Sequence, residues 1–271
     1  MDPNLVSAIR SEILGRIPQS QLSTGEVQYL SALPLRELLS VYFNWRNRSV
    51  SARPRTVHRS NKVVAKNLPE VEKLAQKIEE GCDLSPRLST RVEEAINLKR
   101  AKPGRLCSRP DLDLLLNDWG IHHLHLSDVD RGDGYVVRTG DLLFIAFRRD
   151  DAYLLDVLGH GAWNNQSLVD IATANWPESR LFFHVPKMTS EFSVSERERK
   201  KLRNNGIHTP VQLSTGFAFG PGLTRGGTSA IIELKINKLW NSIAIDEMTS
   251  SHQAILEKVR NALDFCPFSD R

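Results

Sequence analysis

Cysteine is scarce in this sequence, which holds only Cys82, Cys107 and Cys266, far apart and without a CxxC pair. An odd and scattered set of this kind does not form a disulfide framework, and it cannot supply a four-cysteine zinc site. We therefore expect reduced thiols and a cytoplasmic protein.

Long apolar runs are missing as well. The longest purely apolar run is Leu142–Phe147, whereas roughly 20 residues are needed to cross a bilayer. The N-terminus lacks a basic segment followed by an apolar one, which is the pattern of a secretory signal. The sequence thus predicts neither a signal peptide nor a membrane partner.

Acidic residues are absent from residues 38–68, a segment that we call the basic arm, although the chain as a whole has a net charge of only +4. Its cations are Arg46, Arg48, Arg53, Arg55, Arg59, Lys62 and Lys66, with His58 among them. Guanidinium groups match phosphate oxygens in a two-point geometry. The arm residues predicted to contact nucleic acid are Arg46, Arg48, Arg53 and Arg55. The alternative is that the arm's arginines pair with carboxylates elsewhere in the fold.

Hydrophobic spacing predicts an α+β protein. Apolar residues recur at helical spacing in the N-terminal third, at 3–16, from Thr24, at 35–45 and at 68–81. A basic turn rich in proline and glycine near residue 103 marks a boundary. The predicted division is a helical N-terminal region with the basic arm (1–103), an α/β core with a central antiparallel sheet (104–190) and a small α/β extension (191–271).

The predicted sheet uses the segments 121–126, 142–147 and 152–158, with Gly132 and Gly134 in the first turn. In the C-terminal extension, residues 193–206 form a highly charged helix that we expect to face solvent. Two further strands are expected around the glycine-rich loop Gly220–Gly227, which lacks the GxxxxGK[ST] pattern of a P-loop.

Three histidines are the candidate catalytic residues. In the strand at 121–126, side chains alternate between two faces, so His123 and His125 lie on one face with Ile121. The other face carries His122 with two leucines and points to the core, which predicts a packed His122. His160 follows the strand at 152–158 and joins His123 and His125 if adjacent strands pair.

These histidines suit two kinds of chemistry. Three imidazoles could bind zinc with one open position, but no HExxH occurs and no carboxylate stands at a familiar ligand offset, so we expect no metal or cofactor. Metal-free cleavage of RNA needs a base, an acid and cations around the phosphate. His123, His125 and His160 would supply proton transfer, and Arg138, Arg148 and Arg149 would contact phosphate.

The stretch YVVRTGDLLFIAFRRDDAYLLDVLGHGAW, followed by a helix, resembles the sheet core of RelE/ParE-type toxins. The resemblance covers roughly the middle third of a chain that is over twice as long as members of that family. It implies a small antiparallel sheet and an activity that cuts ribosome-bound mRNA or poisons gyrase. By this resemblance, Arg138 and Arg148 contact phosphate and His160 acts in proton transfer.

The sequence therefore favours a protein that acts on nucleic acid, an RNase-like toxin or defence effector. Its implied partners are RNA rather than DNA, and a protein antitoxin or regulator. The alternative is a module without catalytic activity that uses the basic arm on nucleic acid or on an acidic protein. Steep weakening of binding with salt would identify nucleic acid as the ligand of the arm. A further alternative is that the three histidines only cap or pack.

Overall fold

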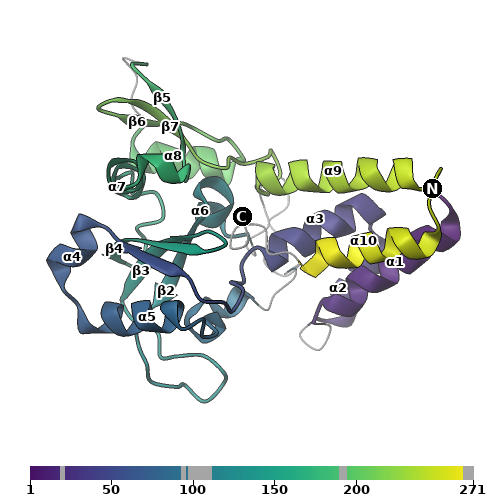
Figure 1. Ribbon diagram of the computed structural model, residues 1–271, viewed down its shortest axis with the longest axis horizontal. Helices are drawn as coiled ribbons and strands as arrows, with labels where there is room; N and C mark the ends of the chain where they lie inside the picture. Colours follow the sequence, from purple (N-terminus) through teal and green to yellow (C-terminus); the bar gives the residue numbers. More distant parts are fainter. Residues whose placement is uncertain (19–21, 93–95, 97–111, 189–193, 265–271) are drawn as a thin grey trace.

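The structure, a computed structural model, describes residues 1–18, 22–92, 96, 112–188 and 194–264. It consists of a helical lobe and a lobe that contains the sheets (Figure 1), and it confirms the predicted α+β class. Cys82 is an exposed free thiol. The predicted boundary near residue 103, Cys107 and Cys266 lie outside the described residues.

The helical lobe joins both ends of the chain around one apolar core. Its helices are α1 (Pro3–Arg16), α2 (Thr24–Ala32), α3 (Leu35–Arg46), α9 (Ala230–Asp246) and α10 (His252–Asp264). The predicted strand after the glycine-rich loop is wrong, because that segment is α9. Ile232, Ile236 and Ile243 recur at helical spacing, which places them on one face of α9 and in the core.

The larger sheet has the order β1-β4-β3-β2. Its strands are β1 (Thr56–Arg59), β2 (Ile121–His125), β3 (Asp141–Phe147) and β4 (Asp151–Gly159). The predicted antiparallel pairing of β2, β3 and β4 is confirmed. The sheet as a whole is mixed, however, because β1 pairs in parallel with β4. Part of the basic arm is therefore a strand of this sheet.

β3 is buried on both of its faces, as its uniformly apolar sequence predicts. One face packs under α4 (Asn61–Lys66) and α5 (Pro69–Glu79), and the other under α6 (Leu114–Trp119) and α7 (Ser167–Asn175). Short 3-10 helices cover Ser85–Arg87, Thr90–Val92 and Pro177–Ser179. The face under α6 and α7 is the one on which the candidate histidines lie.

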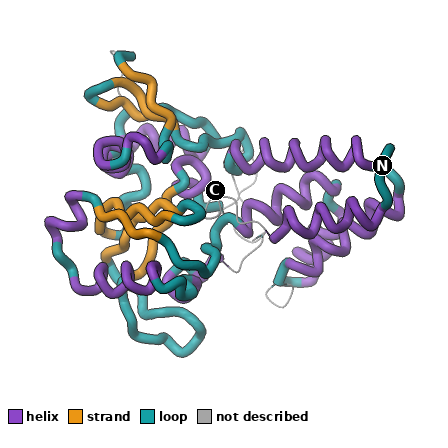
Figure 2. Tube along the Cα trace, in the orientation of Figure 1, coloured by secondary structure: helices purple, strands orange, loops and turns teal. Residues whose placement is uncertain are grey.

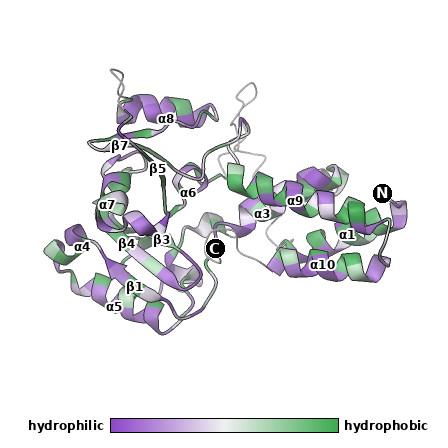
Figure 3. Cartoon of the chain, turned by 45° about the horizontal axis from the view of Figure 1, so that its top comes forward, coloured by the Kyte–Doolittle hydropathy of each residue, from purple (hydrophilic) through white to green (hydrophobic). Residues whose placement is uncertain are grey.

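A second, antiparallel sheet has the order β5-β7-β6 and lies beside α7 and α8 (Figure 2). It is formed by β5 (Phe183–Pro186), β6 (Val211–Leu213) and β7 (Gly216–Phe219), and α8 (Glu196–Asn204) is largely hydrophilic (Figure 3). Gly220 begins the glycine-rich loop. A Cβ there would lie 2.4 Å from the carbonyl oxygen of Asp118, so only glycine lets the loop pack this closely.

The apolar cores do not follow the three predicted segments 1–103, 104–190 and 191–271. Residues 50–92 share a core with the large sheet rather than with α1 to α3, and α9 and α10 share a core with α1 to α3. Within the described residues, no helix combines the length and the apolarity needed to span a bilayer.

Candidate functional site

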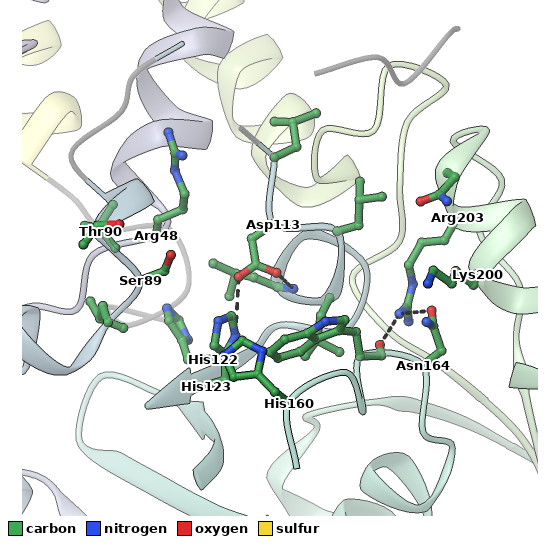
Figure 4. A pocket seen from close by; sticks show the side chains of 18 of the residues that line it. Arg48, Ser89, Thr90, Asp113, His122, His123, His160, Asn164, Lys200 and Arg203 are labelled. Atoms are coloured by element: carbon green, nitrogen blue, oxygen red, sulfur yellow. Dashed lines mark hydrogen bonds and ion pairs between the residues drawn. The ribbon is translucent and has the colours of Figure 1, made fainter. Parts of the chain in front are cut away.

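A cavity of about 480 Å³ opens where β2, α6 and α8 meet the segments that follow α3 and β4. Its polar lining is formed by Arg48, Ser89, Thr90, Asp113, His122, His123, Arg138, His160, Asn164, Lys200, Arg203 and Asn204. Figure 4 shows the histidines at its base, Arg48 on one side, and Lys200 and Arg203 on the other. The volume falls in the range of small-ligand sites.

His123 and His160 both lie against the indole of Trp163. The centroid of the Trp163 ring is 4.6 Å from that of His123 and 5.3 Å from that of His160. Strand alternation directs His123 toward this side of the sheet, and β4 ends immediately before His160. The backbone N–H of His160 donates to the carbonyl of Gly140, 2.9 Å away, which ties the end of β4 to the start of β3. An imidazole from β2 and one from the residue after β4 thus meet in one cavity.

His125 is beside this pair but does not line the cavity. Its ring centroid is 6.0 Å from that of His160, and its side chain is buried. Burial, followed by the charge of Arg138, lowers the pKa of His125 to about 4. Its Nδ1 accepts a hydrogen bond of 3.1 Å from the backbone N–H of Thr139. His125 therefore contacts the loop that carries Arg138, and the structure does not place it with His123 and His160 in the lining of the cavity.

His122 is packed, as the alternation predicted. It is buried, its ring meets Phe147 edge to face with the centroids 5.3 Å apart, and it is also one of the residues that line the cavity. Burial lowers the pKa of His122 to about 4. His122 is therefore neutral at neutral pH and belongs to the core rather than to the chemistry.

The buried histidines make stability depend on pH. Because the folded-state pKa of His122 lies near 4 rather than 6.5, the unfolded chain binds more protons between those values. The contribution of His122 to the free energy of unfolding is therefore fully present above pH 6.5 and is lost as the pH falls toward 4.

We expect His122→Leu to reduce this loss of stability by about 1.4 kcal/mol per pH unit between pH 6.5 and 4. Urea unfolding across the window measures it, with the exposed His252→Leu as the control. An unchanged slope in His122→Leu would contradict the expectation.

Asp113 was not predicted from the sequence, and it carries two roles. One carboxylate oxygen caps α6 by accepting a hydrogen bond of 3.0 Å from the backbone N–H of Leu116. The other lies 3.6 Å from Nδ1 of His123 (Figure 4). The capping role could have been recognised from an aspartate ahead of three leucines, but the approach to His123 depends on how α6 packs on β2.

Most residues of α8 are exposed, as predicted, but its inner side forms a wall of the cavity. Arg199 and Arg203 are buried, and the Arg203 guanidinium lies 4.2 Å from the centroid of the Trp119 ring. Arg203 Nε also donates to the carboxylate of Asp118 at 2.6 Å. The helix is thus anchored by its inner arginines, and Lys200 on its exposed side reaches the cavity.

The other oxygen of the buried Asp118 carboxylate lies 2.5 Å from Nδ1 of His208. Nη1 of Arg203 donates both to the carbonyl of Trp163 and to the side-chain oxygen of Asn164, at 2.5 and 3.0 Å. Arg203 therefore holds together α6, α8 and the segment that carries Trp163.

The predicted phosphate contacts divide into two groups. Arg48 and Arg138 line the cavity, and Arg46, Arg53, Arg55, Arg148 and Arg149 do not. Arg55 is buried and donates to the backbone carbonyls of Ser51, Arg53 and Arg148. Arg148 donates to backbone carbonyls and lies with Arg149 in the turn before β4, roughly 25 Å of strand away from His160. These two arginines do not meet the histidines, because His160 stands at the opposite end of β4.

Several other cations of the basic arm have carboxylate partners, as the alternative interpretation predicted. Arg59 pairs with Glu72 at 2.9 Å, Lys66 with the buried Asp156 at 2.8 Å, and His58 with Asp151 at 2.7 Å. The arm is thus divided between α3 of the helical lobe and the sheet lobe, and it is not one continuous free surface.

Within the described residues, no group of three or more His, Cys, Asp or Glu side chains is arranged to hold a metal ion. Comparison with known proteins identifies no matching family model, curated protein or solved structure. The site therefore has to be interpreted from its own geometry.

Proposed function

We propose that this protein cleaves RNA at the cavity between β2, α6 and α8, using His123 and His160 for proton transfer. One observation carries the proposal: both imidazoles lie against Trp163, in a cavity that is also lined by cationic side chains. Arg138 and Lys200 are exposed on the cavity wall and form no ion pair with another described residue. Cations in this state are suited to an anionic ligand such as a phosphodiester.

The proposed reaction is an internal transfer at phosphorus. The 2′-hydroxyl oxygen of the substrate attacks the adjacent phosphorus, and the bond from phosphorus to the 5′ oxygen of the next nucleotide breaks. The products are a 2′,3′-cyclic phosphate and a free 5′-hydroxyl. One imidazole removes the 2′-hydroxyl proton, and the other gives a proton to the departing 5′ oxygen.

The roles of the two histidines follow from their surroundings. Asp113 faces Nδ1 of His123, which favours a proton on Nδ1 and leaves Nε2 able to accept one. We assign the base to His123 on this ground. His160 is exposed, and we assign it the role of the acid that gives a proton to the leaving oxygen. Arg138 and Lys200 stabilise the charge that builds on the phosphate oxygens.

The direct test is incubation of the purified protein with a labelled single-stranded RNA and with the DNA of the same sequence. We expect the RNA to be cut into fragments ending in 2′,3′-cyclic phosphate and 5′-hydroxyl, and the DNA to stay intact because it lacks the 2′-hydroxyl. Intact RNA, or fragments with 3′-hydroxyl ends, would contradict the proposal.

Asp113→Asn separates the two roles of Asp113. Asparagine is as good a helix cap as aspartate, so the thermal stability should change little. Loss of the carboxylate should lower the cleavage rate about tenfold or more. The rising limb of the pH–rate profile should move to lower pH, because the carboxylate no longer favours protonation of His123. A rate loss with an unmoved profile, or a matching loss of stability, would contradict this assignment.

A further inference from the structure

A second cavity, of about 630 Å³, lies between α7, the segment 176–182 and the β6–β7 hairpin. It is separate from the first cavity, since the two share no lining residue. Gln166 closes one end by donating a hydrogen bond of 2.6 Å from its side-chain amide to the carbonyl of Gln212. The volume is in the range of small-ligand sites.

Part of the cavity wall is apolar and aromatic, and the rest is formed by polar residues such as Gln166, Thr173 and Ser179. Leu181 and Phe182 are more than nine-tenths buried, and they line it together with Leu213. The half-buried Trp176 is held at the cavity by its ring contact with Tyr153, whose ring centroid is 5.1 Å away. A flat apolar group has surface to contact here, and an indole is the aromatic ring that attracts cations most strongly.

Among the described residues that line this cavity there is one carboxylate and no lysine or arginine. Asp170 and His184 are the only titratable residues among the described lining residues. His184 Nε2 lies 3.1 Å from the hydroxyl of Thr215. Asp170 is an exposed residue that forms no ion pair with any described residue, and the partial burial of its carboxyl group raises the pKa of that group. A carboxylate beside apolar walls without a cation of its own is stabilised when a ligand supplies the positive charge.

We propose that this cavity binds a small organic cation, an amine or guanidinium group carried on a flat apolar body. The cationic group pairs with the Asp170 carboxylate beside the Trp176 indole, and the apolar body lies on Leu181 and Phe182. The proposal is independent of RNA cleavage, because it uses none of the residues assigned to that reaction.

The test compares two ligands of the same shape and opposite charge, tryptamine and indole-3-propionate, by isothermal titration calorimetry on the full chain. We expect tryptamine to bind about tenfold more tightly, because only its ammonium group can pair with Asp170. Asp170→Asn should abolish the difference. Glu178→Gln is the matched control, since it removes an equal charge from an exposed position next to the cavity lining, and it should preserve the difference.

Chemical-shift changes in amide NMR spectra locate the binding and should fall on α7, Trp176 and the β6–β7 hairpin. Equal affinity for the two ligands, no binding of either, or a preference for tryptamine that survives in Asp170→Asn would each overturn the proposal.

Discussion

Replacing His160 with alanine is expected to lower the rate of RNA cleavage by about 10²–10⁴-fold, the usual contribution of one proton-transferring side chain. The His160 side chain is exposed, and its ring contacts are with Trp163 and His125. The substitution therefore removes a proton donor without removing Arg138 or Lys200 from the cavity. Binding of RNA should persist while cleavage stops.

Single-turnover cleavage measures the first effect. Fluorescence anisotropy with an uncleavable 2′-O-methyl RNA measures the second, at several salt concentrations. The logarithm of affinity should fall linearly with the logarithm of salt, with a slope near −0.7 for each phosphate engaged on a single strand. His252→Ala, at an exposed histidine of the helical lobe, should behave as the wild type. Unchanged cleavage by His160→Ala would remove His160 from the mechanism, and equal losses of binding and cleavage would make it a binding residue.

Replacing Arg203 with methionine is expected to lower the free energy of unfolding by about 3 kcal/mol or more, the effect of breaking a buried ion pair from one side. The side chains of Arg203 and Asp118 are 3% and 2% exposed, so the Asp118 carboxylate loses a partner that water cannot replace. Methionine keeps much of the apolar contact with Trp119. His208 remains on the other carboxylate oxygen, which places the expected loss at the lower end of the range for buried pairs.

Urea unfolding of a double-mutant cycle checks this expectation. Adding Asp118→Asn to Arg203→Met should recover part of the loss, because no uncompensated charge is then buried. Arg197→Met, at an exposed position on the same helix, should change stability by less than about 0.5 kcal/mol. A small effect of Arg203→Met, or strict additivity in the cycle, would show that the pair does not hold α8 in place.

Two predictions from local patterns were confirmed at the site. Alternation along β2 correctly assigned His122 to the core and His123 to the opposite face, because neighbouring side chains of a strand always point to opposite sides. The hairpin of β3 and β4 followed from two apolar runs around a polar turn. Alternation did not reveal that the backbone N–H of Thr139 would donate a hydrogen bond to His125, since that contact joins β2 to the loop before β3.

The errors have a common physical origin. The spacing of apolar residues records which side of an element is buried, but not which other element buries it. Residues after the glycine-rich loop were predicted to form a strand, although Ile232 and Ile236 recur at helical spacing and lie in α9. Arg148 and Arg149 are close to His160 in sequence and distant in space because an intact strand separates them.

The amino-acid sequence by itself determined the α+β class, the positions of most helices, the pairing of β2 with β3 and β4, and the face on which His123 lies. Each of these depends on periodicity within a short segment. Only the tertiary structure decided that Asp113 meets His123, that Arg203 binds Asp118, and that Arg138 and Lys200 share one cavity. Those contacts join side chains from different elements, and their geometry is set by how whole elements pack on one another.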